Sequence, residues 1–356
     1  MGRRAVEEVL KWSGRQSWIL SGGGVAERVY ASFGDEELPH HYVARCGAAD
    51  SVKRFFDWRS SSERRWPLVG AFRRPLFFGG GDFTTEVEEN CCNVQTSSIF
   101  VDVRIPTRRD AALSEAKTKE ERLRILSRQH AFAGITVYDA PFATRHHLID
   151  WNYLGRGVHA SSRTRPNKWR VEALKNNTWK ESSYARGDDN QSYYFELWRK
   201  RSKGAYEIAL ASLRGHCVFV LGGDTFAYAL DNRTIPARGS CAEAVDRDLN
   251  SDYIDLLAGH GRTRRDGKLK IDASLQPEHQ GRDLSDLIGL DITQLMTHTS
   301  LPRQLPPEFF LSEEEDSSSS PQKKTSLYSP FDEGAYLFEH HLPDEKAQQW
   351  YYTNKN

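Results

Sequence analysis

Histidines stand side by side at three places in the chain, and imidazole is the side chain best suited to acid–base chemistry near neutral pH. The pairs are His40-His41, His146-His147 and His340-His341. Neighbours in a strand point to opposite faces, so one pair cannot supply two ligands to a metal ion. We interpret these histidines first as surface or hydrogen-bonded core residues, because partly buried imidazoles commonly have no catalytic role. The alternative is that one of them points into a cavity and acts as an acid or base.

One of these pairs lies in the segment 143–155, ATRHHLIDWNYLG, which also contains Asp150. In a regular strand His146 and Asp150 share one face, whereas His147 shares the other face with Trp151. Positions four apart in a strand are separated by ~13 Å, so no direct bond between His146 and Asp150 is expected. The functional alternative places His147 and Trp151 near a pocket.

A carboxylate flanked by aromatic rings occurs in YYFELWRK, residues 193–200, where Glu196 shares a strand face with Tyr194 and Trp198. A surface position is the favoured interpretation, because glutamate is rarely buried without a partner. The alternative is a buried acid inside a pocket, and in that case burial raises the pKa of Glu196.

The clearest strand pattern, IFVDVRI, carries Phe100, Asp102 and Arg104 on one face. The apolar face of a half-buried strand is normally the core, so we favour solvated positions for Asp102 and Arg104. The alternative is that the aliphatic face packs outward against a second layer. In that case Arg104 could bind a carboxylate and Phe100 could stack on a ligand inside a barrel. The aliphatic face consists of Ile99, Val101, Val103 and Ile105.

The sequence contains none of the short motifs that bind phosphate or a metal or that present a nucleophile. Glycine runs at 79–81 and 222–223 lack the spacing of a phosphate-binding loop and are typical of turns. No G-x-S-x-G nucleophile turn and no H-E-x-x-H metal helix occur. We therefore expect no cofactor and no metal.

The 356 residues include 49 Lys and Arg, which are balanced by 49 Asp and Glu. This balance gives no reason to expect nucleic acid or an anionic membrane as a partner. The N-terminus lacks a signal-peptide core, and no apolar run is long enough to cross a bilayer. The five cysteines show no C-x-x-C spacing and are typical of reduced thiols. We expect a cytoplasmic protein without a membrane span.

The elements that must position these residues are short runs rich in aromatic and β-branched side chains, which begin at Trp66. Many short strands separated by turns favour a sandwich or barrel over β-α-β units. One helix is expected at 118–129, where Thr118 and Glu121 form a capping box. A closing strand is expected after residue 330. Other strands are expected at 83–87, 94–105, 132–138, 145–153, 169–174, 192–199, 205–211, 216–222, 225–230 and 269–274.

Two segments differ from the strand-rich pattern. Residues 1–65 form an N-terminal extension that we expect to be partly helical or disordered. Residues 312–324 are low in complexity and are expected to be a disordered loop. Within that loop the acidic serine tract 312–320 suits an acidophilic kinase, which would make it a contact for a kinase or another protein. A solvated linker is the favoured interpretation.

Several short motifs together resemble a little-characterised family of fungal and bacterial proteins that contain two lipocalin-like (calycin) barrels in one chain. Its fungal members are named for interaction with a casein-kinase-one-type enzyme. The resemblance covers roughly residues 66–280 and gives no catalytic residues to carry over. The motifs are AFAGIT at 131–136, HHLID at 146–150, YFELWR at 194–199, QTSSIFVDVRIPTRR at 95–109 and GGDTFAYALDNR at 222–233.

The resemblance implies a mainly β fold of two lipocalin-like antiparallel barrels in tandem, with the short helix inserted in the first. We expect the first barrel at 66–203 and the second at 204–356. Such barrels enclose space for one small ligand. Abundant Trp and Tyr on the strands suit a hydrophobic or aromatic ligand. The residues expected near the pocket of the first barrel are Phe100, Arg104, Phe132, His147, Trp151, Tyr194, Glu196 and Trp198.

Three functions remain open at this point. The favoured one is an intracellular barrel protein that binds a small hydrophobic or aromatic ligand. The second is a cofactor-independent enzyme of the isomerase, lyase or hydrolase type that uses a His or Glu inside the barrel as acid or base. The third is a phospho-regulated protein-interaction module. Clustering of at least His147, Glu196 and Arg104 around one apolar cavity would favour the enzyme.

Overall fold

The computed structural model describes most of the chain from Trp66 onward. The N-terminal extension 1–65, the tract 312–324 and the segment 348–352 lie outside the described residues. The expectations about the extension and about the acidic serine tract therefore stay predictions. The described ranges are 66–79, 82–151, 167–183, 194–204, 206–233, 241–264, 267–290, 295–296, 301–302, 304–310, 330–331 and 333–341.

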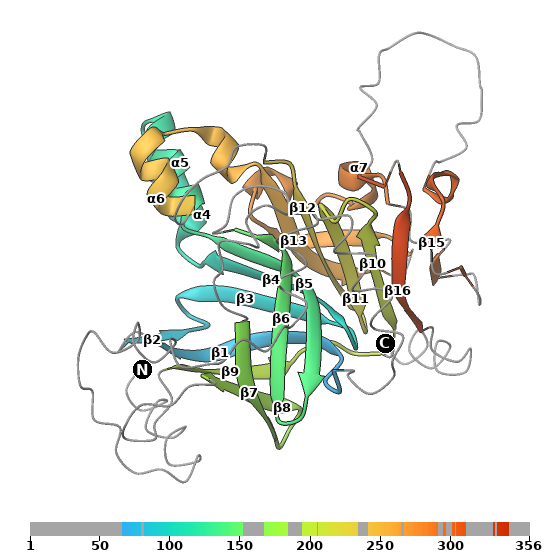
Figure 1. The fold of residues 1–356 in the computed structure, drawn as a ribbon. Coiled ribbons are helices and arrows are strands. Elements are labelled where there is room, and N and C mark those ends of the chain that lie inside the picture. Colours follow the sequence, from blue (N-terminus) through green and yellow to red (C-terminus); the bar gives the residue numbers. More distant parts are fainter. Residues whose placement is uncertain are drawn as a thin grey trace, which may run out of the picture.

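The first half of the chain forms a closed antiparallel β-barrel. Its nine-stranded sheet has the order β2-β1-β3-β4-β5-β6-β7-β8-β9, and β1 also pairs with β9. Strand β2 pairs only with β1 and is not part of the closed ring. The ring therefore has eight strands (Figure 1). The strands are β1 (Gly70–Gly79), β2 (Asp82–Thr85), β3 (Glu89–Gln95), β4 (Ile99–Pro106), β5 (His130–Asp139), β6 (Phe142–Asp150), β7 (Asn167–Leu174), β8 (Thr178–Ser183) and β9 (Tyr194–Lys200).

One predicted strand, 94–105, is in fact a hairpin of β3 and β4. The chain turns at Thr96–Ile99, where the Thr96 amide donates to the Ile99 carbonyl at 2.9 Å. Polar residues that hydrogen-bond their own backbone favour such turns. The turn places Val94 opposite Val101 and Gln95 opposite Phe100.

The predicted helix is present as α5 (Lys119–Ser127), and its capping box is confirmed. The Glu121 amide donates to Thr118 Oγ1 at 3.1 Å, and the Thr118 amide donates to Glu121 Oε2 at 3.2 Å. The sequence did not predict α4 (Arg109–Glu115) or α6 (Cys241–Asp248). The three helices gather at one edge of the molecule in Figure 1, and Arg128 of the α5 end pairs with Asp246 of α6 at 2.9 Å. Within the described residues, no helix has the length and apolar character needed to span a bilayer.

The second half forms a seven-stranded antiparallel sheet of order β14-β13-β12-β11-β10-β16-β15. The described residues of this sheet show no pairing between β14 and β15, so they form an open sheet where a second barrel was expected. The predicted closing strand is β16. The strands are β10 (Glu207–Ser212), β11 (Cys217–Gly222), β12 (Thr225–Asp231), β13 (Leu256–Thr263), β14 (Leu269–Ser274), β15 (Gln304–Leu305) and β16 (Ala335–His341); α7 (Ser285–Ile288) packs beside them.

The two sheets are stacked and share one hydrophobic core. Strands β3, β4 and β5 of the barrel contact β11 and β12 of the second sheet. The aliphatic face of β4, represented by Val101 and Val103, packs outward into this shared core. The backbones come closest where a Cβ on Gly222 would lie 2.9 Å from Gly70 Cα, which leaves no room for a side chain.

This stacking corrects the favoured interpretation of β4. Asp102 was expected to be solvated, but it is fully buried, and Arg104 is largely buried. Both faces of β4 are covered, because the outer face meets the second sheet and the inner face meets the barrel interior. The alternative interpretation, with Phe100, Asp102 and Arg104 turned inward, is confirmed by the contacts described below.

Candidate binding site inside the barrel

The barrel interior is formed by the strand faces that point away from the shared core. Contacts between strands that are not neighbours in the ring identify it, because such contacts can be made only across the inside. Arg104 of β4 reaches Glu196 of β9 at 3.3 Å, and Arg145 of β6 donates to Gln95 of β3 at 3.2 Å. The interior therefore contains charged or polar groups from at least four strands.

The Glu196 carboxylate accepts hydrogen bonds from two arginines. Arg74 Nη1 donates to Glu196 Oε1 at 2.8 Å, and Arg104 Nη1 donates to the same oxygen at 3.3 Å. Arg104 also binds Asp102 with two bonds of 3.0 Å, and Arg74 also pairs with Glu89. Burial acts to raise the pKa of Asp102, but Arg104 outweighs it, so this pKa lies below its usual value. Arg104 thus favours the ionised form of the buried Asp102 carboxylate.

Glu181 and Glu196 are register partners on β8 and β9, and both are buried. Burial and the charge of Glu196 raise the pKa of Glu181 well above its usual value. Burial also acts to raise the pKa of Glu196, but Arg104 and Arg74 outweigh it and hold that pKa below its usual value. An ionised Glu196 therefore accepts a hydrogen bond from a protonated Glu181.

Arg145 lies between two aromatic rings. Its Cζ is 4.2 Å from the centre of the Phe100 ring and 5.0 Å from that of Trp169. Its Nη2 donates to Gln95 Oε1, its Nη1 lies 3.6 Å from Asp102 Oδ2, and its Nε has no partner within the described residues. Burial lowers the pKa of Arg145, while Glu181 and Asp102 act to raise it.

His147 is bonded to Asp150 through its Nδ1, at 2.6 Å from Asp150 Oδ2. The sequence argument assumed a regular strand, in which His147 and Asp150 lie on opposite faces. The pairing of β5 with β6 shifts register between Ala133 and Gly134, so β6 carries one extra residue and the two side chains share a face. The His147 ring packs against Phe132 at 5.2 Å. A bonded His–Asp pair is a candidate acid–base group.

The second half of the chain supports the end of β6 next to this pair. Arg233 is buried, and its Nη2 and Nη1 donate to the carbonyl oxygens of Asp150 and Trp151 at 2.7 and 2.9 Å. Asp231 holds the guanidinium in place with bonds of 2.8 and 2.9 Å. Asp231, at the end of β12, and Arg233, two residues later, thus hold the backbone of Asp150 and Trp151 in place.

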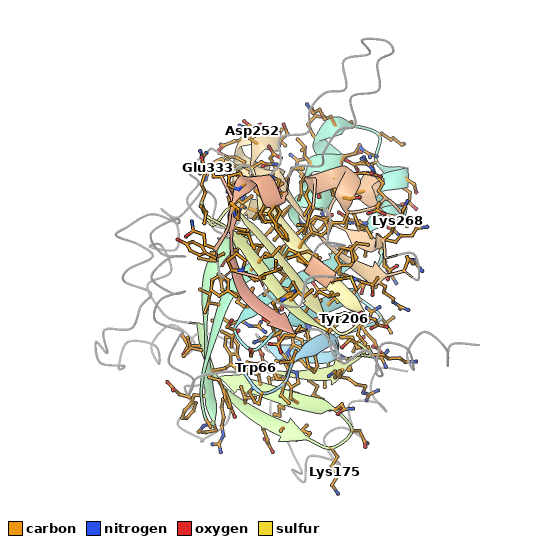
Figure 2. The ribbon with its side chains drawn as sticks, turned by 90° about the vertical axis from the view of Figure 1, so that its right-hand side faces the viewer. Trp66, Lys175, Tyr206, Asp252, Lys268 and Glu333 are labelled. Atoms are coloured by element: carbon orange, nitrogen blue, oxygen red, sulfur yellow. The ribbon has the colours of Figure 1, made fainter. Side chains whose placement is uncertain are left out.

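A stack of tryptophans occupies another part of the interior. Trp179 and Trp198 lie parallel at 5.6 Å, and Trp66 meets Trp179 edge-on at 5.2 Å. Trp66 Nε1 donates to the Leu68 carbonyl, which satisfies its polar atom. In Figure 2, Lys175 marks the far tip of the barrel in the β7–β8 turn, and Trp66 lies nearer the second sheet.

Unpartnered polar atoms are concentrated in this interior. Of fifteen buried side-chain nitrogen and oxygen atoms without a hydrogen-bond partner in the described chain, ten belong to it. A proton held between Glu181 and Glu196 satisfies two of them, which leaves eight. Six of the eight are N–H donors. The eight are Asn93 Nδ2 and Oδ1, Gln95 Nε2, Thr136 Oγ1, Arg145 Nε, Trp169 Nε1, Trp179 Nε1 and Trp198 Nε1.

The structure brings most of the predicted site residues together. Trp151 is an exception: it is buried in the shared core, and its Nε1 donates to the Ser127 carbonyl at 3.0 Å. The extra residue in β6 turns it away from the barrel interior, so its predicted pocket position is wrong. Tyr194 begins β9, but its side chain lies outside the described part of the chain. The six that face the interior are Phe100, Arg104, Phe132, His147, Glu196 and Trp198.

Sequence reasoning missed several interior residues because it examined strands one at a time. Arg145 and Glu181 are charged residues within strands, and each shares a face with other polar or aromatic residues at a spacing of two. A closed barrel buries that face on every strand, so this pattern is the signal that could have found them. The missed residues are Arg74, Asn93, Gln95, Thr136, Arg145, Asp150, Trp169, Trp179 and Glu181.

The described residues contain no group of three or more His, Cys, Asp or Glu side chains placed to hold a metal ion. What the interior offers is a set of hydrogen-bond donors, one protonated carboxyl, one His–Asp pair and several aromatic faces. These groups can bind a polar molecule and can exchange protons with it.

No protein-family model and no curated protein matches the sequence. Among solved structures, the chain is similar to the crystal structure of an uncharacterized protein from Saccharomyces cerevisiae. The two are 13% identical, the match covers 77% of this chain and 99% of that chain, and the TM-score is 0.40. That likeness says nothing about function, and the resemblance to the double-barrel family stays a prediction.

Proposed function

We propose that the protein binds one small polar molecule inside the barrel. The observation that carries this proposal is the group of eight buried polar atoms without partners in the interior. Each unsatisfied buried polar group costs about 1–3 kcal/mol, so a set of this size calls for a hydrogen-bonding guest. Closed barrels of eight strands are either filled by their own side chains or hold one small ligand, and unpartnered polar atoms in the interior favour the second case.

The ligand should present more hydrogen-bond acceptors than donors. Six N–H groups point into the interior, three of them from the indoles of Trp169, Trp179 and Trp198. The same indoles offer flat apolar faces, which suit a planar ring or the apolar face of a sugar. The sequence led us to expect a hydrophobic ligand, but charged and amide side chains form much of this lining. We therefore propose a polar, acceptor-rich ligand with a flat apolar part.

Native mass spectrometry of the full chain, before and after extraction with organic solvent, tests the proposal. A retained small molecule that is lost on extraction is the expected result. The variant Thr136→Val removes one unpartnered hydroxyl while keeping the side-chain shape, and it should retain less of that molecule. Glu172→Gln, on the exposed outer face of β7, is the control and should retain as much as the wild type. Protein that is empty under all conditions and binds none of a broad metabolite panel would contradict the proposal.

A second function is favoured by a specific observation. His147 is bonded to Asp150 at 2.6 Å, and the same interior contains Arg104, Glu196 and the protonated Glu181. His147, Glu196 and Arg104 thus lie in one interior, although its lining is polar and not the apolar one expected from the sequence. We infer a cofactor-independent enzyme that moves protons on the bound molecule, with the His147–Asp150 pair as base and Glu181 as acid.

Deuterium exchange tests the enzymatic function. The protein is incubated with a metabolite mixture in heavy water, and mass spectrometry finds compounds that gain deuterium at carbon. The expected result is at least one compound that is labelled by the wild type but not by His147→Gln or Glu181→Gln. Labelling that survives both substitutions, or no labelling of a molecule shown to bind, would reject the enzyme while leaving binding intact. The phospho-regulated interaction module depends on residues 312–320 and stays a prediction.

A further inference from the structure

Arg145 is the least neutralised of the three interior arginines. Arg74 and Arg104 each reach a carboxylate oxygen at 3.0 Å or less, whereas the ion pair of Arg145 with Asp102 measures 3.6 Å. Both oxygens of Asp102 are already bound by Arg104. Burial and the charge of Glu196 raise the pKa of Glu181, the other carboxyl that acts on Arg145, so its neutral form is favoured and it compensates the Arg145 charge less well. The interior therefore has one arginine whose charge is poorly compensated.

The guanidinium of Arg145 is also fixed in orientation. Phe100 and Trp169 flank it at 4.2 and 5.0 Å, and Gln95 accepts a bond from its Nη2. The edge formed by Nε and Nη2 is one of the two sides of the guanidinium fork that bind a carboxylate with two parallel bonds. Nε on this edge has no partner in the described chain. The edge is thus held ready for a planar anion.

Other unpartnered donors surround this edge. Thr136 is the register partner of Arg145 on the neighbouring strand β5. Gln95, which is bonded to Arg145 through its oxygen, keeps an unpartnered Nε2, and Asn93 lies two residues away on the same face of β3. Trp169 adds an unpartnered Nε1. These four side chains are at most 2% exposed.

We propose that Arg145 and its neighbouring donors form an anion subsite, and that the ligand of the barrel carries a carboxylate bound there by Arg145. The inference rests on the proposed function and names its ligand class. A single negative charge fits best, because Asp102 and Glu196 lie in the same interior and would repel a dianion such as inorganic phosphate. Neutral N–H donors and one arginine can stabilise one carboxylate without a further cation.

Matched pairs of acid and amide test this subsite on the full chain. Benzoate and benzamide have nearly the same shape but differ in charge, and acetate and acetamide form a smaller pair. Isothermal titration and thermal unfolding measure the binding of each probe, with inorganic phosphate as a further anion. We expect one or both carboxylates to bind at least about tenfold more tightly than the matching amide and than phosphate.

Substitutions locate the binding. Arg145→Gln should weaken the carboxylate at least about tenfold, and Arg145→Lys should weaken it less, because lysine keeps the charge but loses the planar fork. Arg170→Gln is the control: Arg170 is exposed on β7, the strand next to β6, and its substitution should leave the affinity unchanged. If Arg145→Gln does not fold, Thr136→Val tests the same subsite with a change that conserves shape.

The outcomes separate this inference from the proposed function. Equal binding of acid and amide, or carboxylate binding that survives both Arg145→Gln and Thr136→Val, overturns the anion subsite. The anion subsite is also overturned if none of the tested anions binds at millimolar concentration. If a neutral compound then binds and Thr136→Val weakens it, the proposed function stands without the anion subsite. If native mass spectrometry also finds no retained molecule, the proposed function falls too.

The pH dependence gives an independent check. Glu181 faces Glu196, Arg145 and Arg104, and once ionised it competes with a bound carboxylate for Arg145. Since the pKa of Glu181 is raised, the affinity for the carboxylate should be highest between the pKa of the free carboxylic acid and the raised pKa of Glu181. It should fall several-fold as the pH rises through that raised pKa. Glu181→Gln should abolish this decrease, and a decrease that persists in this variant contradicts the role of Glu181.

Discussion

The barrel interior and the outer face of the second sheet are both closed to solvent, yet they contain opposite kinds of side chains. On the second sheet, Leu210, Phe219 and Leu221 belong to a cluster of aliphatic and aromatic residues whose polar atoms are limited to two tyrosine hydroxyls and one thiol. The barrel interior contains three arginines, at least four carboxyl groups and eight unpartnered polar atoms. The same chain therefore can build an ordinary apolar core, and its polar barrel interior calls for a functional explanation.

The difference also shows where stability comes from. Burial of hydrocarbon on the second sheet contributes about 25 cal/mol per Å² without requiring exact partners. The barrel interior depends on a network in which Arg74 and Arg104 are paired with carboxylates, and buried pairs of this kind contribute little net stability while their disruption is costly. Substitutions should therefore have different consequences in the two regions.

The largest effect is expected at Glu196, because its loss leaves Arg74 and Arg104 without their shared partner. Glu196→Gln should lower the free energy of unfolding by about 3–5 kcal/mol in urea denaturation. The control is Glu333→Gln, which breaks an exposed pair with Arg214 and should cost about 0–1 kcal/mol. Similar losses for the two variants would contradict a charge network that holds the interior together.

A slightly smaller effect is expected in the apolar region. Leu210→Ala removes a fully buried side chain and should lower the free energy of unfolding by about 2–5 kcal/mol. Any molecule retained in native mass spectrometry should still be bound at temperatures where this variant is folded. If the Leu210→Ala protein is folded but no longer retains the molecule, the prediction that the two regions act independently is contradicted.

Removing an unpartnered polar group from the barrel interior should raise the free energy of unfolding and not lower it. Thr136→Val replaces a buried hydroxyl that has no partner by a methyl group of similar shape. Extracted, ligand-free protein should become more stable by about 1 kcal/mol, measured by urea denaturation. If this variant is less stable than the wild type, the hydroxyl has a structural partner and its role in binding loses support.

The smallest effect is expected in the pH dependence of the free energy of unfolding, through Glu181. Its folded pKa is raised above the unfolded value, so its contribution to stability is fully present below the ordinary carboxyl pKa. That contribution is lost as the pH rises toward the raised pKa. Glu181→Gln should therefore flatten the decrease of the free energy of unfolding between acidic and neutral pH. An identical pH profile in wild type and variant would show that Glu181 does not hold a proton in the folded protein.

Much of the fold could be predicted from local patterns. Alternation of apolar and polar residues located most strands of the barrel, and the capping box located α5. The missed strands have weaker patterns: β8 reads TWKESS, and β13 reads LLAGHGRT with two glycines. Short polar strands and glycine-containing strands form because their neighbours pair with them, and a single sequence does not show those neighbours.

The candidate site was harder to predict, since it depends on how strands are covered and where they bulge. The strand pattern alone favoured a solvated Arg104, because nothing in IFVDVRI shows that a second sheet covers its aliphatic face, and only the family resemblance placed Phe100 and Arg104 near a pocket. One extra residue in β6 brought His147 to Asp150 and removed Trp151 from the interior. Register shifts of this kind are set by the partner strand, so the spacing of residues in β6 alone gave the wrong pairs.

The close backbone contact at Gly222 has a consequence for how a guest reaches the barrel. The second sheet covers β1 and β3–β6, so that side of the ring is packed against another layer. Strands β7, β8 and β9 lie on the opposite side, toward the tip marked by Lys175 in Figure 2. Entry and exit of a molecule should therefore use the uncovered half of the ring, and a cross-link placed there would slow exchange.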